Sequence, residues 1–89
     1  MPDAFALAGP APNPASRRAT IEYALPEPAD VTIAVYDVLG RRVATLADGR
    51  AEAGRHRAAA EVGQMPSGTY FVRMQAEGFR QTRRLTVVR

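Results

Sequence analysis

Apolar residues alternate with polar or small ones along most of the chain. The two clearest early sets are Ile21, Tyr23 and Leu25, followed by Val31, Ile33 and Val35. A period of two places alternate side chains on one face of a strand, so each set predicts a strand with one buried face. Pro26-Glu27-Pro28 separates the two strands, and Gly40 after the second can take the positive φ of a hairpin loop.

The same alternation predicts four later strands, at about residues 42–46, 56–61, 69–76 and 79–89. In the clearest of them, Tyr70, Val72 and Met74 share one face, and Phe71, Arg73 and Gln75 share the other. Glu77-Gly78 predicts a tight hairpin turn between the last two strands. In the last strand two polar residues have the parity of the apolar Leu85 and Val87, which indicates a bulge or a partly exposed end. These two are Gln81 and Arg83.

Two segments lack the strand pattern. Residues 48–54 begin and end with turn signals, and the stretch between these signals is too short for more than one helical turn, so we expect a loop. Residues 1–18 are rich in alanine and proline and predict a linker that leads into the domain, with Phe5 and Leu7 on one face of a short edge strand. The expected organisation is a linker at residues 1–4 and one domain at residues 5–89.

Six or seven short strands with close turns, and no segment of helical period, indicate an all-β fold. We expect an antiparallel sandwich or barrel with Greek-key connections. The 89 residues have room for one compact core, and a hydrophobic content of 46% is enough to form it. The chain contains no cysteine, so its stability must come from packing without disulfides.

Charge and hydropathy argue against several classes of function. The net charge is +3 and all twelve basic residues are arginine, but acidic residues are interspersed among them, so we expect no nucleic acid as a partner. No run of about 18 apolar residues occurs, so we expect no transmembrane segment. Met1-Pro2-Asp3 does not begin a signal peptide, and we expect any export signal to lie upstream.

Six fragments form an ordered pattern along the chain. They are Pro12-Asn13-Pro14, Ile21-Glu22-Tyr23-Ala24-Leu25-Pro26, Val35-Tyr36-Asp37-Val38-Leu39-Gly40-Arg41, Ala53-Gly54-Arg55-His56, Pro66-Ser67-Gly68-Thr69-Tyr70-Phe71-Val72-Arg73, and Arg83-Arg84-Leu85-Thr86-Val87-Val88-Arg89. No single fragment is specific, but their order and spacing resemble the type A C-terminal sorting domain of the bacterial type IX (Por) secretion system. That family is similar to the immunoglobulin-like domain of the flagellar hook-capping protein, so the resemblance implies an immunoglobulin-like β-sandwich of about seven strands.

The resemblance also implies a function. Such domains lie at the C-terminus of larger secreted proteins, direct them across the outer membrane, and are removed or used to leave the cargo on the cell surface. The implied partners are the outer-membrane secretion machinery, a surface processing peptidase and an N-terminal cargo domain in the same chain. The implied route leads through the periplasm to the cell surface or the medium. We expect the isolated module to be a monomer or a weak dimer and not an enzyme, whereas the parent protein can be a secreted hydrolase.

The chain departs from the family pattern at a few positions. Ala15 stands where an aromatic residue usually follows Pro-Asn-Pro, and Ala60 stands where a bulky residue is frequent. Arg83 and Arg84 occupy positions where the family often has lysine, which keeps the charge but changes the hydrogen-bond geometry. These differences concern packing detail and receptor affinity rather than the fold.

The last strand is the candidate recognition element. Its candidate residues are Arg80, Gln81, Arg83, Arg84, Leu85, Val87 and Arg89. A partner can bind a terminal strand by β-augmentation while the arginines attract an acidic surface. The alternative is a solvated strand edge whose charges protect it against aggregation. The residues expected to support the fold are Tyr36, Asp37, Gly40, Gly54, His56, Gly68 and Tyr70.

No catalytic, metal or cofactor site is expected. His56 is the only histidine and has no evident partners for catalysis or metal binding, so it is expected to be a hydrogen-bonded structural residue. Asp37 lacks the alternating oxygen ligands of a calcium loop and is expected to bond the backbone of its turn. Ser16 and Ser67 lack the context of a nucleophile elbow.

The aromatic residues carry the alternative function, a carbohydrate-binding or spacer module appended to a secreted glycoside hydrolase. Such a module needs exposed aromatic rings as a platform. The chain has no tryptophan, and its aromatic residues fall mostly at alternating strand positions, which favours packing in the core. They are Phe5, Tyr23, Tyr36, Tyr70, Phe71 and Phe79.

Overall fold

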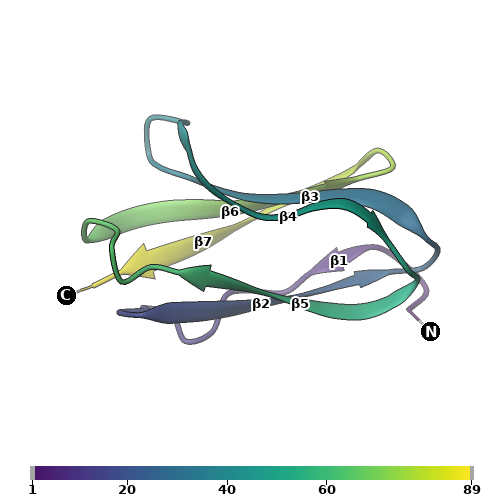
Figure 1. Ribbon diagram of the computed structural model, residues 1–89, viewed down its shortest axis with the longest axis horizontal. Coiled ribbons are helices and arrows are strands. Elements are labelled where there is room, and N and C mark those ends of the chain that lie inside the picture. Colours follow the sequence, from purple (N-terminus) through teal and green to yellow (C-terminus); the bar gives the residue numbers. More distant parts are fainter. Residues whose placement is uncertain (1, 89) are drawn as a thin grey trace.

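The computed structural model describes residues 2–88, and within this range the chain forms seven strands and no helix. The strands are β1 (Ala6–Leu7), β2 (Arg18–Leu25), β3 (Ala29–Tyr36), β4 (Arg42–Ala51), β5 (Gly54–Glu61), β6 (Gly68–Ala76) and β7 (Phe79–Val87). They form two facing antiparallel sheets, with β1, β2 and β5 below and the other four strands above in Figure 1. The prediction of an all-β antiparallel sandwich is confirmed. In the described range, no helix is present that could cross a membrane.

The strand orders are β1-β2-β5 in one sheet and β4-β3-β6-β7 in the other. The chain crosses between the sheets after β2, after β4 and after β5, so that β5 returns to pair with β2 and β6 returns to pair with β3. These crossings are Greek-key connections, which we expected although the strand pattern alone does not determine them. β7 lies at one edge of the four-stranded sheet.

The core lies between the two sheets and contains the apolar residues that the alternation predicted to be buried. Its fully buried members include Ile21, Leu25, Ile33, Val35, Val72, Met74, Leu85 and Val87. Burial of each such side chain stabilises the fold by about 1.5–3 kcal/mol relative to exposure. Ala15 and Ala60, the two departures from the family pattern, are also buried in this core.

The predicted loop at residues 48–54 is wrong over most of its length, because β4 continues to Ala51 and β5 begins at Gly54. The extension pairs with β3, where Asp30 lies opposite Arg50 and Val31 lies opposite Gly49. A partner strand therefore supplies hydrogen bonds that override weak local strand propensity. The β3–β4 register shifts twice, and one of these shifts lies between Val35 and Tyr36.

The lead-in segment before β2 packs against the sandwich, so the interpretation of residues up to 18 as a linker is wrong from about residue 5. Leu7 in β1 is buried, and Ala11 forms an antiparallel bridge with Thr20. Ala15 forms a parallel bridge with Val87. The boundary between linker and domain at residue 4 stays a prediction.

The hairpin predicted at Glu77-Gly78 is confirmed. Ala76 pairs with Phe79, which leaves a two-residue turn whose φ angles are 46° at Glu77 and 86° at Gly78. Positive φ at both central residues is the requirement of a type I′ turn, whose twist matches that of the flanking strands. The turn therefore sets the register between β6 and β7.

Candidate recognition surface

β7 pairs with β6 without a register shift, from Gly68 opposite Val87 to Ala76 opposite Phe79. The bulge that we considered for this strand is therefore absent, and the partly exposed end is confirmed. The side that buries Leu85 and Val87 also carries Gln81 and Arg83, which are not buried. The opposite side, which forms the outer face of the sheet, carries the exposed Arg80, Thr82 and Arg84.

Arg83 occupies the inner side of β7 because it lies at the rim of the sandwich rather than in its core. Its Nε donates a hydrogen bond to the backbone oxygen of Leu7 at 2.8 Å. The side chain thus links the edge strand of one sheet to β1 of the other. A charged residue is tolerated on the core-facing side of the strand here, because its guanidinium bonds a backbone acceptor and remains accessible to solvent.

The free edge of β7 is covered along its last residues by the lead-in segment. The side-chain amide of Asn13 donates to the oxygen of Arg84 at 3.0 Å and accepts from the N–H of Thr86 at 2.9 Å. The backbone of Ala15 continues the pairing, since its N–H donates to the Thr86 oxygen at 2.8 Å and its oxygen accepts from Val88 N–H at 2.9 Å. We call residues 13–15 the edge clip.

The edge clip limits how a partner can contact the strand. The outward backbone groups of the chain from Arg84 to Val88 are already hydrogen-bonded to the clip. β-augmentation at this stretch would therefore require displacement of the clip. Leu85 and Val87 are fully buried and support the strand from below. The charged side chains that remain accessible are those of Arg80 and Arg84 on the outer face and Arg83 at the rim. Arg89, also a candidate, lies outside the described residues.

The turn at residues 37–41 is organised by Asp37, as predicted. Its Oδ1 accepts hydrogen bonds from the N–H groups of Leu39 at 2.9 Å and Arg41 at 3.0 Å, and its Oδ2 accepts from Arg41 Nε at 2.8 Å. The bond from the Arg41 backbone, together with the other two, lowers the pKa of the Asp37 carboxyl. Gly40 has a φ of 81°, a conformation that glycine adopts without strain.

Tyr36 lies on the outer face of the sheet between two arginines. Nη2 of Arg42 and Nη2 of Arg73 both donate to its hydroxyl oxygen, at 3.1 and 2.9 Å. The Arg73 guanidinium carbon is 4.4 Å from the centre of the Tyr36 ring, and that of Arg42 is 5.7 Å away. The hydrogen bond from Arg42, with that from Arg73, lowers the pKa of Tyr36.

The other supporting residues have structural partners. Tyr70 is only 7% exposed, and its hydroxyl donates to the oxygen of Pro66 at 2.7 Å. His56 Nε2 lies 2.8 Å from the oxygen of Glu52, so the prediction of a hydrogen-bonded histidine is confirmed. Its ring stacks on Tyr23 with 5.3 Å between centroids, and burial raises the pKa of Tyr23. Two further supporting glycines adopt positive φ, 129° at Gly54 and 154° at Gly68.

Two aromatic residues that we expected in the core lie outside it. Tyr36 and Phe71 are half-buried on the outer face of the four-stranded sheet, whereas Tyr23 and Tyr70 are buried and Phe5 and Phe79 stack on each other beside the core. The signal was present in the sequence, because Tyr36 has the opposite parity to the buried Val35, and Phe71 the opposite parity to the buried Val72.

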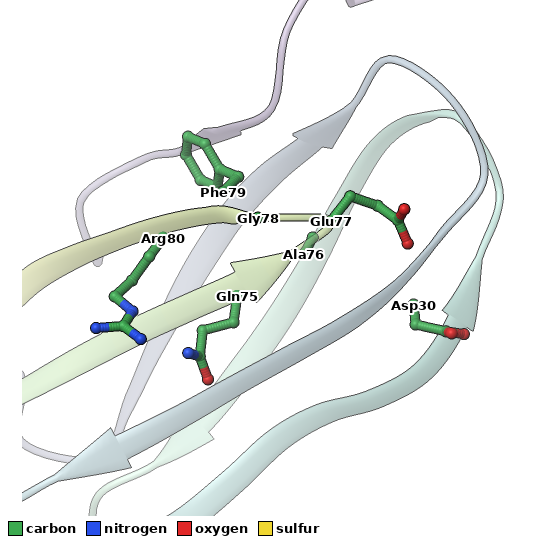
Figure 2. Close-up of a pocket in the computed structure, with 7 residues that line it drawn as sticks. All are labelled: Asp30, Gln75, Ala76, Glu77, Gly78, Phe79 and Arg80. Atoms are coloured by element: carbon green, nitrogen blue, oxygen red, sulfur yellow. The ribbon is translucent and has the colours of Figure 1, made fainter.

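Polar groups do not converge into a catalytic constellation in the described range. Figure 2 shows the pocket beside the β6–β7 hairpin, with the carboxylates of Asp30 and Glu77 on one side and the guanidinium of Arg80 on the other. Neither a histidine nor a serine or cysteine nucleophile lines it. Among residues 2–88, no three histidine, cysteine, aspartate or glutamate side chains gather as metal ligands would.

Comparison with known proteins assigns the chain to a family. The family model of the secretion system C-terminal sorting domain matches residues 11–88, which include the edge clip and all strands from β2 to β7. No curated protein matches the chain. The likeness to the flagellar hook-capping domain stays a prediction. With five of the six motif fragments wholly inside the matched range and the sixth reaching its end, the chain belongs to the family of type IX (Por) secretion system C-terminal sorting domains, which are non-catalytic sorting modules of larger secreted proteins.

Proposed function

We propose that the chain sorts an N-terminal cargo domain of the same protein and then holds it at the cell surface. Its partners are the outer-membrane secretion machinery and a surface processing peptidase. The route leads through the periplasm to the cell surface or the medium. Family membership supports the sorting role, and the module itself has no catalytic step to perform.

The recognition element in this proposal is the set of accessible arginines on β7. The observation that carries it is the edge clip, because a partner that approaches residues 84–88 meets bonded backbone and must contact side chains instead. Among residues 2–88, neither Arg80, Arg83 nor Arg84 forms an ion pair with a carboxylate. Their charge is therefore available to steer and orient an acidic partner.

A secretion assay tests the proposal. The segment is fused to a fluorescent protein that carries an export signal, in a host with type IX secretion. The double variant Arg80→Gln/Arg84→Gln keeps a polar aliphatic side chain and removes two charges from β7. Arg17→Gln/Arg55→Gln removes two exposed charges elsewhere that form no ion pair among residues 2–88. We expect the first variant to lose surface and medium fluorescence and the second to retain it.

Two results would contradict the proposal at different levels. If the intact fusion stays in the periplasm, the module is not a sorting signal for this route. If the intact fusion and the Arg80→Gln/Arg84→Gln variant are exported equally, the β7 arginines are not the recognition element. Deletion of residues 79–88 is a poorer test, because it also removes Leu85 and Val87 from the core.

The half-exposed rings of Tyr36 and Phe71 are the observation that favours the alternative, a carbohydrate-binding module on a secreted glycoside hydrolase. An affinity gel with soluble glycans, and pull-down with insoluble ones, separates it from sorting. Retardation that disappears in Phe71→Ala, together with periplasmic retention of the fusion, would favour the carbohydrate-binding alternative.

A further inference from the structure

A shallow groove lies on the outer face of the four-stranded sheet, beside the turn at residues 37–41. It is lined by Tyr36, Asp37, Val38, Gly40, Phe71, Arg73 and Thr82. We call it the Tyr36 groove. It spans β3, β6 and β7 and does not include the edge clip, which lies at the free edge of β7. Arg42 of β4 reaches it through the Tyr36 hydroxyl.

Two cations converge in this groove on one neutral acceptor. The guanidinium groups of Arg42 and Arg73 both bond the Tyr36 oxygen, and among residues 2–88 neither has a carboxylate within 4.0 Å. Bringing like charges together raises the electrostatic free energy, and a nearby anion offsets that cost. The arrangement therefore favours an anion from outside the described chain.

Hydrogen-bond donors around the Tyr36 hydroxyl outnumber acceptors, since the Asp37 carboxylate, which also lines the groove, is engaged by Leu39 and Arg41. The Tyr36 hydroxyl accepts from both arginines, and its own proton has no acceptor within residues 2–88. Nε of Arg73 is buried and has no hydrogen-bond partner in the same range. Each guanidinium carries five N–H donors, of which one is used at the Tyr36 oxygen. A carboxylate, which only accepts, matches this surplus.

The wall of the groove adds an apolar component. Val38, at the tip of the turn, lines the groove and is 68% exposed, whereas its exposed neighbour Leu39 does not line it. The tip is held in place by the hydrogen bonds from Leu39 and Arg41 to Asp37 rather than left to fold back on the core. An exposed valine on a fixed turn, beside the half-exposed Phe71 ring, is a surface suited to being covered by a partner.

We propose that the Tyr36 groove docks an acidic segment of a protein partner. A carboxylate of that segment accepts from Arg42, Arg73 and the Tyr36 hydroxyl, and a neighbouring apolar side chain packs between Val38 and Phe71. The inference rests on the proposed sorting function and deepens it, because the partner is then a component of the export machinery.

The composition of the groove favours a protein over a glycan or a nucleic acid. The Arg73 guanidinium covers one face of the Tyr36 ring, and stacking platforms for sugars or bases need free ring faces. The exposed Val38 side chain matches apolar side chains and not hydroxyls or phosphates. Tyrosine, phenylalanine and arginine are also the residue types enriched in the cores of protein interfaces.

An NMR titration of the isolated module tests the groove directly. The probe is a short synthetic peptide in which glutamate alternates with leucine, and the controls are polyglutamate and heparin. We expect the peptide to shift the amide signals of Tyr36, Phe71 and Arg73. Loss of one charge-assisted hydrogen bond in Arg42→Gln should weaken binding by about tenfold or more. Arg55→Gln removes an exposed charge on β5 that forms no ion pair within residues 2–88, and it should leave binding unchanged.

The outcomes separate this inference from the proposed function. Absence of shifts in the groove, or equal binding of heparin and the peptide, would overturn the docking of an acidic protein segment. In the secretion assay, Arg42→Gln and Val38→Asp should reduce export while the melting temperature is retained. Export equal to that of the intact fusion would reject the groove and leave the sorting function standing. An intact fusion that is not exported would reject the sorting function, and the titration would still decide the groove.

Discussion

The edge clip makes a quantitative prediction about Asn13. Asn13→Ala removes both side-chain hydrogen bonds to β7, one to the Arg84 oxygen and one from the Thr86 N–H. A hydrogen bond contributes about 0.5–1.5 kcal/mol net, and Asn13 is exposed, so each bond belongs in the lower part of that range. The expected loss is about 1–2 kcal/mol in the free energy of unfolding. For a domain of this size, that corresponds to a melting temperature lower by roughly 4–16 °C.

Two measurements on Asn13→Ala check the mechanism. Thermal unfolding gives the global loss, and hydrogen exchange of the Thr86 amide reports the local one, because this N–H donates to the Asn13 side chain. We expect Thr86 to exchange about 5- to 30-fold faster. The matched control is Ser16→Ala, an exposed polar residue that follows the clip and makes no hydrogen bond to β7 within the described range. If Asn13→Ala and Ser16→Ala have the same melting temperature and the Thr86 amide keeps its protection from exchange, the clip does not stabilise the strand.

Three further predictions concern single side chains. Tyr70→Ala should cost about 3 kcal/mol by leaving a cavity, whereas Tyr70→Phe should cost about 1 kcal/mol, since it loses only the bond to Pro66; equal denaturant midpoints for the two would contradict this. Asp37→Ala should lower the melting temperature at neutral pH. Because the Asp37 pKa is depressed in the folded state, its contribution is present above about pH 4 and is lost as the pH falls further, so a difference from the parent that stays constant into acid would be inconsistent. In an alkaline absorbance titration Tyr36 should ionise before Tyr23, and Tyr36→Phe should remove the step that belongs to Tyr36; an unchanged titration curve would show that the arginines do not act on it.

The fold was predictable because burial of one strand face imposes a period of two. Val72 and Met74 in β6 show this directly, since both are fully buried and their neighbours are not. The extension of β4 was not predictable, because Asp48 and Gly49 have weak strand propensity and are held by pairing with β3. Local sequence records propensity, whereas pairing across a sheet is decided by the partner strand.

The candidate site was predictable in part. The position of β7 followed from its alternation. The edge clip joins two residues that are 71 positions apart in the sequence, and no local pattern predicts such a bond. We expected Tyr36 in the core, although its parity, opposite to that of the buried Val35, indicates the outward direction. Its partner Arg42 was not predictable, because the β3–β4 register shifts just before Tyr36, and a shift of one residue changes which side chains lie opposite each other.

The edge clip also has a consequence for the timing of biosynthesis. A nascent chain that has not yet produced β7 lacks Leu85 and Val87 for the core, and Asn13 has no backbone to bond. Folding that depends on contacts between distant segments cannot be completed until the later segment has been made. Under the proposed function, a product of interrupted translation would carry cargo without a folded signal. Export would then act as a check that synthesis had continued through residue 88.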